Sequence, residues 1–343
     1  MDWILIVDDD VVNLKMAGTI LSRQGMRVTA LKSGQALLDF LPRLESENKE
    51  FPDLCLLDIK MPLMNGFETL KKLRAYEKRQ LSSELPVIFL TADESGEAET
   101  MGLSLGAMDF IKKPFIPEVL TLRVRHTIDL VRLQKNLENE VAKKTEENYK
   151  LFIHVVLALA AAIDAKDIYT NGHSARVAKY AKEIARRYGY NEKQQNDIYV
   201  MGLLHDVGKI GVPDAIIKKS DSLTDEEYEL IKKHPVIGAR ILESIKEMPT
   251  LAYGARWHHE KYSGGGYPDG LIGGEIPEQA RLIAVADAYD AMASRRSYRD
   301  VLPQDVVRKE IEKGKGTQFD PVFADIMLEM IDEDKEYKMK ESN

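Results

Sequence analysis

Residues 54–62 read Leu-Cys-Leu-Leu-Asp-Ile-Lys-Met-Pro, a short apolar run that ends in an aspartate and is closed by a proline. A run of this length with polar and Pro boundaries is typical of a buried β-strand. Similar runs recur along the first 117 residues, and amphipathic stretches such as Asn13–Gln24 and Phe67–Tyr76 separate them. This alternation predicts a parallel sheet with helices on both faces. The five predicted strands are Trp3–Val7, Val28–Leu31, Leu54–Leu57, Val87–Leu90 and Asp109–Ile111.

Polar side chains follow four of these predicted strands, at the point where each strand ends. Asp8 and Asp9 follow the first strand, Asp58 the third and Thr91 the fourth, and Lys113 comes shortly after the fifth. The carboxyl ends of parallel strands share one crevice, so we expect these side chains to lie together. A hard divalent cation such as Mg2+ relieves the repulsion among three carboxylates. One carboxylate can then attack a phosphoryl donor while the cation, the hydroxyl and the ammonium stabilise the phosphoryl oxygens.

Over residues 1 to about 125 the sequence resembles the receiver domain of two-component response regulators. The matching runs are Ile4–Asp10, Leu56–Pro62, Leu90–Ala92 and Lys113–Phe115. The resemblance implies that Asp58 is the phosphoacceptor and that a cognate sensor histidine kinase is the partner. The Mg2+ ligands that it implies are Asp8, Asp9, Asp58 and the backbone carbonyl of Lys60. It assigns the switch to Thr91, Lys113 and Phe110, although Phe110 fits a plain core position equally well.

The region from Pro117 to Lys150 has a different pattern. It contains no Gly or Pro after Pro117, it is dense in charge, and apolar residues recur at intervals of three or four. These apolar residues are Leu130, Leu133, Leu137 and Val141. The pattern predicts one long helix with a narrow apolar stripe. Two interpretations remain open, namely a solvated spacer helix or a parallel coiled coil that joins two copies into a homodimer.

Strand patterns end after this region, and residues from Tyr149 to about Asp334 predict helices only. The predicted helices include Leu151–Asp164, His173–Tyr188, Gln194–Asp206, Asp225–Lys233, Pro235–Ile245, Pro277–Ala293 and Pro303–Lys313. Thr224 followed by Glu227 predicts a capping box at the start of one of them. The expected fold is multidomain. Its parts are an α/β domain with a doubly wound, parallel five-stranded sheet over 1–122, a linker helix over 123–150, an all-α domain over 151–335 and a charged tail over 336–343.

Histidine is unevenly distributed along the chain. Of seven histidines, five fall between residues 173 and 259. These are His173, His205, His234, His258 and His259, and the carboxylates that accompany them are Asp206 and Asp287. Six nitrogen and oxygen side chains around a bridging aspartate can hold two divalent transition metals, whereas a structural zinc usually takes thiolates. Two such metals can activate water and clamp a phosphate for in-line displacement. Lys209, three residues after Asp206, can neutralise a phosphate oxygen.

Over roughly residues 150–335 the sequence resembles the HD-GYP family of the HD phosphohydrolase superfamily. The matching runs are His173–Val177, Leu204–Asp214, Lys233–Pro235, His258–Glu260, Gly266–Pro268 and Ala286–Ala291. The resemblance implies hydrolysis of cyclic di-GMP to the linear dinucleotide pGpG, and in some members onward to GMP. The ligands that it implies for one metal, with Fe or Mn expected, are His173, His205, Asp206 and Asp287. Asp206 would bridge to a second metal, whose other ligands are His234, His258 and His259.

The same resemblance implies roles on the substrate side of the pocket. Asp206 and Lys209 are the expected catalytic residues, with Lys209 as the phosphate contact. The expected substrate contacts in the Gly-rich loop Lys261–Glu275 are Tyr267 and Pro268. Arg296 and Arg299 fit either a contact with phosphate or guanine or an ordinary surface position.

The sequence departs from the family pattern at two positions. Members with a third metal carry Glu four residues before the first histidine ligand, where this chain has Tyr169. Two metals and a linear product are therefore expected. The family usually has Asp in the loop after His258–Glu260, where this chain has Ser263, so an orienting charge is lost there.

The composition of the 343 residues excludes several classes of protein. A net charge of -8 and the lack of a helix-turn-helix candidate disfavour DNA binding, and the charge also disfavours an anionic membrane surface. No apolar stretch is long enough to predict a membrane span. Acids stand where a signal peptide needs Lys or Arg, and the single Cys55 suits a reducing compartment, so a cytoplasmic location is expected.

These observations favour a response regulator that hydrolyses a cyclic dinucleotide and is regulated through Asp58. A non-catalytic dinucleotide sensor or partner-docking module is the alternative class, and the complete ligand set is evidence against it. A phosphodiesterase for another linear or mixed dinucleotide keeps the chemistry and changes the substrate. Recognition of the bases depends on the shape of the pocket, which the sequence does not reveal.

Overall fold

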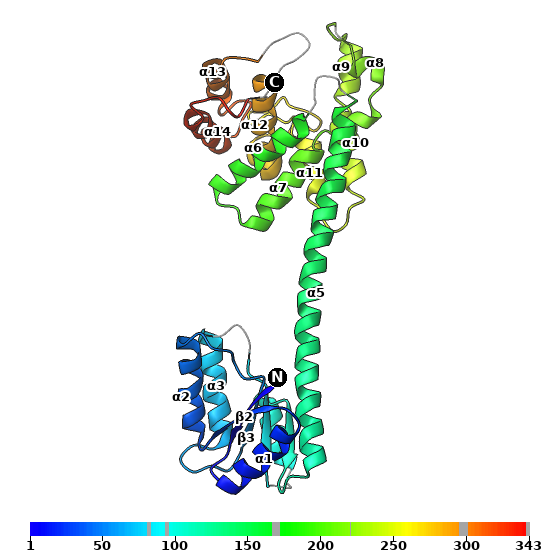
Figure 1. Cartoon of the computed structure of the whole chain (residues 1–343). Coiled ribbons are helices and arrows are strands. Elements are labelled where there is room, and N and C mark those ends of the chain that lie inside the picture. The colour runs from blue at the N-terminus through cyan, green and yellow to red at the C-terminus, as the bar shows by residue number, and fades with distance from the viewer. Residues whose placement is uncertain (81–83, 93–95, 167–171, 220, 295–300, 341–343) are drawn as a thin grey trace. The chain divides into compact units, whose positions relative to one another are not determined.

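The computed structural model describes residues 1–80, 84–92, 96–166, 172–219, 221–294 and 301–340. The chain forms two compact units, residues 1–145 and residues 146–343 (Figure 1). Among the described helices, none combines the length and the hydropathy that crossing a bilayer requires.

A five-stranded parallel sheet forms the centre of the first unit. Its strands are β1 (Trp3–Val7), β2 (Arg27–Leu31), β3 (Leu54–Asp58), β4 (Val87–Thr91) and β5 (Asp109–Lys112). They lie in the order β2-β1-β3-β4-β5, and every neighbouring pair is parallel. The predicted strands are confirmed, four of them extended by one residue. The register pairs Asp58 of β3 with Leu90 of β4, which brings the polar ends of these strands to one edge of the sheet.

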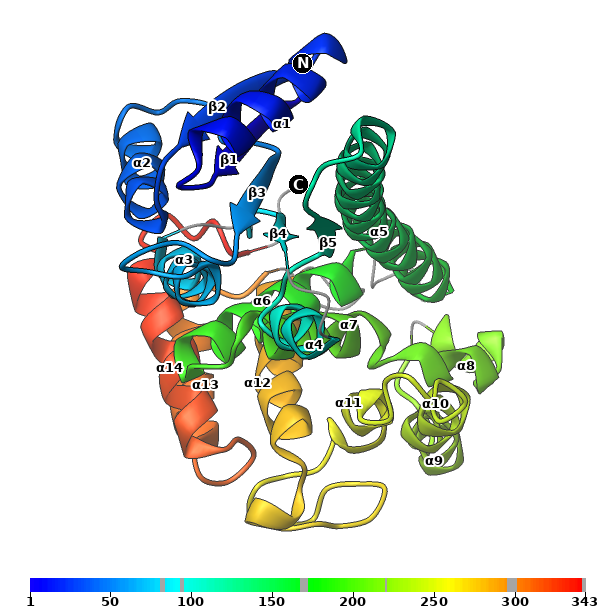
Figure 2. The same cartoon turned by 90° about the horizontal axis from the view of Figure 1, so that it is seen from below.

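Helices cover both faces of this sheet, as the predicted doubly wound fold requires. They are α1 (Val11–Arg23), α2 (Gly34–Ser46), α3 (Gly66–Gln80), α4 (Gly96–Ser104) and the first part of α5 (Pro117–Asp164). Alternate residues of a strand point to opposite faces. In β1, Leu5 and Val7 pack with α2 and α3, whereas Ile4 and Ile6 pack with α1 and α5. Figure 2 shows these two pairs of helices on opposite sides of the sheet.

Helix α5 is one continuous helix of 48 residues, Pro117–Asp164. The sequence predicts a linker helix that ends near Lys150 and a separate helix over Leu151–Asp164, and that division is wrong. No Gly or Pro lies between Pro117 and Gly172, so nothing in this stretch interrupts the hydrogen-bond ladder of the helix.

The second unit is built from helices. They are the last part of α5, α6 (His173–Tyr188), α7 (Glu192–Leu204), α8 (Asp214–Ile217), α9 (Asp225–Ile231), α10 (His234–Leu242), α11 (Leu251–Trp257), α12 (Glu278–Ala293), α13 (Gln304–Gly314) and α14 (Pro321–Glu333), with the 3-10 turns η1 (Val207–Gly211) and η2 (Gly273–Glu275). The capping box is confirmed, since Thr224 and Glu227 exchange both of its hydrogen bonds. Helix α14 was not predicted, although Asp320 caps it and Pro321 opens it.

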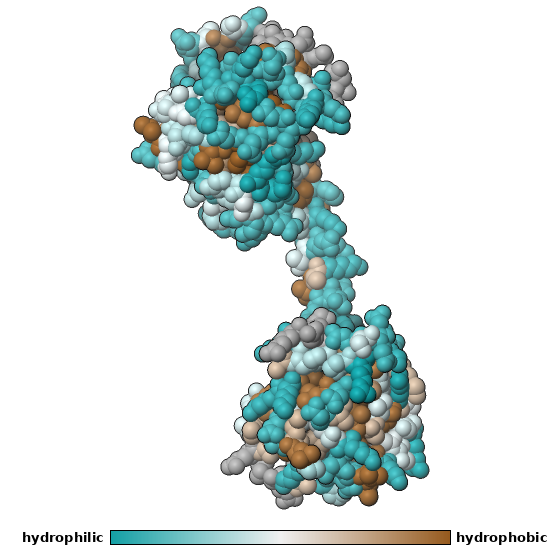
Figure 3. All heavy atoms as spheres, turned by 90° about the vertical axis from the view of Figure 1, so that its left-hand side faces the viewer, coloured by the Kyte–Doolittle hydropathy of each residue, from teal (hydrophilic) through white to brown (hydrophobic). Residues whose placement is uncertain are grey.

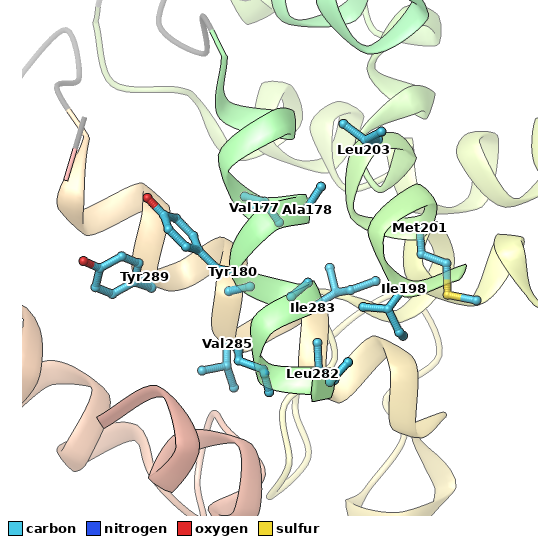
Figure 4. Close-up of a cluster of buried hydrophobic side chains, with 14 of the residues drawn as sticks. Val177, Ala178, Tyr180, Ile198, Met201, Leu203, Leu282, Ile283, Val285 and Tyr289 are labelled. Carbon is cyan, nitrogen blue, oxygen red and sulfur yellow. The ribbon is translucent and has the colours of Figure 1, made fainter. Parts of the chain in front are cut away.

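The core of the second unit lies where α6, α7 and α12 meet. Figure 4 shows Val177 and Tyr180 of α6, Met201 of α7 and Ile283 of α12 in this cluster, and all four are buried. The helices α6 and α7 approach closely because α7 has Gly202 at the contact. A Cβ atom at that position would lie 2.7 Å from the Cα of Ala178. This packing fixes three helices that carry predicted metal ligands, at the start of α6, just after the end of α7 and within α12.

Candidate metal centre

The seven side chains predicted as ligands converge in the second unit. His173 is the first residue of α6 and His234 the first of α10, and Asp287 lies within α12. The remaining four follow the ends of helices, His205 and Asp206 after α7, and His258 and His259 after α11. Five of the seven are at most 5% exposed, namely His173, His205, Asp206, His234 and His258. Residues far apart in the sequence therefore form one buried polar cluster.

The two carboxylate oxygens of Asp206 face two different groups of ligands. Its Oδ2 atom lies 3.8 Å from His173 Nε2 and 3.4 Å from His205 Nε2. Its Oδ1 atom lies 3.3 Å from His234 Nε2 and 3.9 Å from His258 Nε2. Two sets of ligand atoms each lie within 4.8 Å of one another, and these sets are His173, His205 and Asp287, and His234, His258 and His259. Asp206 therefore stands between two triads.

Backbone carbonyls orient three of the imidazoles through their Nδ1 atoms. His205, His234 and His258 each place Nδ1 within 2.7 to 2.8 Å of a carbonyl oxygen of the preceding turn. A carbonyl accepts a proton and cannot donate one, so Nδ1 carries the hydrogen and the Nε2 lone pair is directed into the cluster. Nε2 of His205 is buried without a hydrogen-bond partner in the described part of the chain, as suits a metal ligand.

The charge states of Asp206 and of the two imidazoles His258 and His259 suit cations. Burial and the neighbouring His234 lower the pKa of His259 to about 4, and burial beside His259 holds the pKa of His258 well below its usual value. Burial alone would raise the pKa of Asp206, but the Lys209 ammonium and the imidazoles outweigh it, and the carboxyl stays ionised. Neutral imidazoles and an ionised carboxylate are the forms that bind metals.

Glycines bring the segments of the cluster together. A Cβ atom on Gly208 would lie 1.9 Å from the carbonyl oxygen of His234, so only glycine lets η1 approach α10 this closely. Lys209, the next residue, places its Nζ atom 2.7 Å from Asp206 Oδ2. The predicted phosphate contact therefore lies at the edge of the cluster.

A cavity of about 790 Å3 opens onto the cluster. Of the predicted substrate contacts, Lys209 and Tyr267 line it, and Tyr267 stacks on His259 with 4.7 Å between ring centroids. Pro268 is not among the described residues that line the cavity. Lining residues that sequence reasoning missed include Tyr228 and Ile231 of α9, Lys261, Glu310 of α13 and Gln318. The positions Tyr169, Arg296 and Arg299 lie outside the described residues.

Glu260 organises the Gly-rich loop. It ends the matching run His258–Glu260, but the sequence predicts no role for it. Its buried carboxylate accepts hydrogen bonds from the backbone N–H groups of Asp269, Gly270 and Leu271 at 2.8 to 3.1 Å. Ser263 is exposed, and its backbone N–H donates to the carbonyl of Thr317 at 2.8 Å. The carboxylate next to two predicted histidine ligands therefore holds the loop that carries Tyr267.

A second buried carboxylate, Asp290, was also missed. Its Oδ2 atom lies 2.7 Å from His173 Nδ1, and its Oδ1 atom accepts from Arg176 Nε at 2.7 Å. Asp290 lies three residues after Asp287, so one face of α12 presents both a predicted ligand and the support of another. That spacing was the signal in the sequence that could have indicated Asp290.

The acidic residues of the first unit lie together at the sheet edge. The carboxylates of Asp8, Asp9 and Asp58 include oxygens within 4.8 Å of one another. Lys113 Nζ lies 2.7 Å from Asp8 Oδ2 and 2.8 Å from Asp58 Oδ1. Burial raises the pKa of Asp58, while Lys113 and a backbone hydrogen bond from Lys60 oppose that shift.

Two of the three predicted switch residues, Thr91 and Phe110, are buried. Thr91 ends β4, next to this acidic edge. Phe110 stacks on Phe89 with 5.6 Å between ring centroids. In this structure Phe110 is therefore packed into the core.

Together these features give one unit a sheet edge with the side chains that phosphorylation requires. They give the other unit a cluster of histidines and aspartates that is typical of hydrolases. A family model described as the response regulator receiver domain matches residues 4–125, and one described as the HD domain matches residues 158–322.

A probable cyclic di-GMP phosphodiesterase of Vibrio cholerae is 34% identical over 95% of this chain and 77% of its own length. A cyclic di-GMP phosphodiesterase of Thermotoga maritima is 33% identical over 95% of this chain and 90% of its own. A 3'3'-cGAMP-specific phosphodiesterase of Vibrio cholerae is 36% identical over 55% of this chain and 38% of its own. The chain belongs to the response regulators that join a receiver domain to an HD-type phosphodiesterase domain.

Proposed function

We propose that this protein hydrolyses cyclic di-GMP to pGpG at a two-metal site and that phosphorylation of Asp58 regulates the reaction. The observation that carries the catalytic proposal is the position of Asp206, whose two oxygens face separate triads of ligand atoms. A bridging carboxylate with three further ligands on each side suits a pair of divalent metals, for which Fe or Mn is expected. When bound, the metals would activate water and polarise the phosphate.

The protein's own side chains contribute orientation and charge. The Lys209 ammonium, 2.7 Å from Asp206, would move to a phosphate oxygen of the substrate as a point charge. The hydrogen bonds at Nδ1 hold the imidazoles so that no reorganisation accompanies the reaction.

The walls of the cavity support a nucleotide substrate. Tyr228 and Tyr267 line it, and Lys232 Nζ lies 4.9 Å from the ring centroid of Tyr228 and 5.8 Å from that of Tyr267. Aromatic rings next to a cation suit the stacking of a base beside its phosphate. The two relatives that match most of their length are named for cyclic di-GMP, and this makes it the first substrate to test.

A mixed cyclic dinucleotide is the second candidate substrate. The relative named as specific for 3'3'-cGAMP is 36% identical over 55% of this chain, although over only 38% of its own length. Stacking tolerates either purine, so the aromatic wall supports both candidates.

The test is product formation by the metal-loaded protein. Anaerobically purified protein should contain about two metals and convert cyclic di-GMP to pGpG with Mn2+ or Fe2+. Asp206→Ala should lose both metals and all turnover, whereas Asp305→Ala, at an exposed site on α13, should behave as wild type. Tight binding of cyclic di-GMP without product under every metal would favour the sensor alternative. Faster turnover of 3'3'-cGAMP would change the assigned substrate.

The receiver half of the proposal rests on the acidic edge of the sheet. Asp8, Asp9, Asp58 and the Lys60 carbonyl would bind Mg2+, and Lys113 would hold the phosphoryl oxygens that a sensor histidine kinase delivers to Asp58.

We also infer that two copies associate through α5. The predicted stripe is exposed, with Leu130, Leu133, Leu137 and Val141 each between 45% and 65% accessible. Figure 3 shows such apolar atoms among the hydrophilic surface of α5. Four exposed apolar residues along one helix face suit pairing with the same face of a second copy.

A further inference from the structure

The side chain of Lys166 joins the end of α5 to the turn that carries Lys209. Lys166 is the second residue after α5 ends, and its Nζ atom contacts three carbonyl oxygens. It lies 3.1 Å from the oxygen of Lys209, 2.8 Å from that of Ile210 and 2.7 Å from that of Val212. These three acceptors belong to η1 and the residue after it.

The chemistry of this contact fits a fixed attachment. The last carbonyls of a helical turn carry partial negative charge and have room for a further donor, and that of Lys209 also accepts from the backbone N–H of Val212 at 3.1 Å. An ammonium group has three N–H donors and no acceptor, so it can satisfy three such oxygens at once. The side chain of Lys166 is only 19% exposed, and the contact with Asp214 Oδ1 at 3.4 Å is longer than the three to the backbone.

The attached turn is the one that positions the catalytic residues. The backbone N–H of Lys209 donates to the carbonyl of Asp206 at 2.9 Å, so η1 leads directly from the bridging aspartate. A second attachment lies next to the first. Asp164, the last residue of α5, accepts hydrogen bonds from Ser174 Oγ at 2.6 Å and from Ser174 N at 3.3 Å. Ser174 follows His173, so the end of α5 contacts the segment next to His173 as well as the turn that follows Asp206.

We propose that Lys166 is a positioning residue for the phosphodiesterase reaction. It fixes the η1 backbone to the end of α5 and thereby keeps the Lys209 ammonium within reach of the phosphate. The inference rests on the proposed function, because that proposal is what assigns Lys209 as the phosphate contact. Lys166 itself acts through the main chain and does not line the cavity.

The experiment compares three variants of the full-length protein. Lys166→Met removes the cation and keeps the length of the side chain, and Lys166→Arg restores a cation with several donors. Lys179→Met is the matched control, since Lys179 is exposed on α6. For each we would measure kcat and KM on cyclic di-GMP with Mn2+, the number of bound metals, and hydrogen exchange of the amides in 207–213.

Lys166→Met should lower kcat about 10- to 100-fold with a smaller change in KM, as expected when a catalytic group is misplaced. Its metal content should stay at the wild-type value, and the amides of 207–213 should exchange faster. Lys166→Arg should recover most of the lost kcat, and Lys179→Met should match wild type.

Unchanged exchange of 207–213 in Lys166→Met would overturn the inference, and so would unchanged kcat. A loss of metal that parallels the loss of kcat would also overturn it, because the role would then be structural. If the wild-type protein hydrolyses no dinucleotide, the proposed function fails first. The exchange measurement would then still decide whether Lys166 holds the turn.

Discussion

The Nδ1 atom of His173 lies 2.7 Å from Oδ2 of Asp290, a carboxylate that has no exposed surface. A carboxylate behind a histidine ligand fixes the ring and raises its basicity toward a metal. We therefore expect Asp290→Asn to weaken metal binding about 10- to 100-fold, measured by titration against a competing chelator. Asp305→Asn on exposed α13 is the control. Equal affinity in Asp290→Asn and wild type would contradict this role.

The pair of Lys113 and Asp58 leads to a prediction for the receiver half. Acetyl phosphate with Mg2+ should phosphorylate the wild-type protein, and Asp58→Asn should abolish that phosphorylation because the attacking carboxylate is gone. Removal of Mg2+ by chelation should have the same effect. Phosphate-affinity electrophoresis measures the modified fraction. Asp39→Asn, at an exposed site on α2, should leave it unchanged, and phosphorylation of Asp58→Asn would place the acceptor elsewhere.

Tyr228 leads to a prediction about substrate binding. Tyr228 is 45% exposed and lines the cavity, where a base can stack on its ring. Tyr228→Ala should raise KM for cyclic di-GMP about tenfold and change kcat little, since stacking on one aromatic ring contributes about 1–3 kcal/mol. Tyr228→Phe keeps the ring and should restore the wild-type KM. Equal KM values for the alanine variant and wild type would remove Tyr228 from the substrate site.

The apolar stripe of α5 leads to a prediction about assembly. Leu133 is 65% exposed, and a glutamate there would set like charges against each other in a pair of parallel helices. We expect Leu133→Glu to shift the protein from dimer to monomer in sedimentation experiments. Leu63→Glu is the control, because Leu63 is fully exposed outside the stripe. A wild-type protein that sediments as a monomer would refute the paired helix.

Much of the fold and the site could be predicted from the sequence because its signals are local. Strands β1 and β3 are short apolar runs followed by carboxylates, and the sheet order then brings Asp8 and Asp58 together. The histidines stood out because five of seven fall within one region.

Other contacts could not be predicted because they depend on the tertiary fold. The Lys166 side chain reaches carbonyls more than 40 positions further along the chain, and backbone carbonyls leave no signature in a sequence. Glu260 likewise binds backbone N–H groups of a loop whose path only the folded structure defines. The lack of any helix breaker after Pro117 could have predicted that α5 is continuous. The change from a charged to an apolar composition near Lys150 instead suggested two separate helices.

Because α5 is one unbroken helix, the number of its residues fixes the angle about the helix axis between its two ends. This limits which insertions and deletions preserve that angle. Each residue of an α-helix turns the chain by about 100°, so the loss of one residue would rotate the later residues of α5 by that angle relative to the earlier ones. Seven residues complete two turns to within about 20°, and eleven complete about three. Descendants of this chain can therefore gain or lose linker residues in steps of seven or eleven while keeping the angular phase between the two ends of α5.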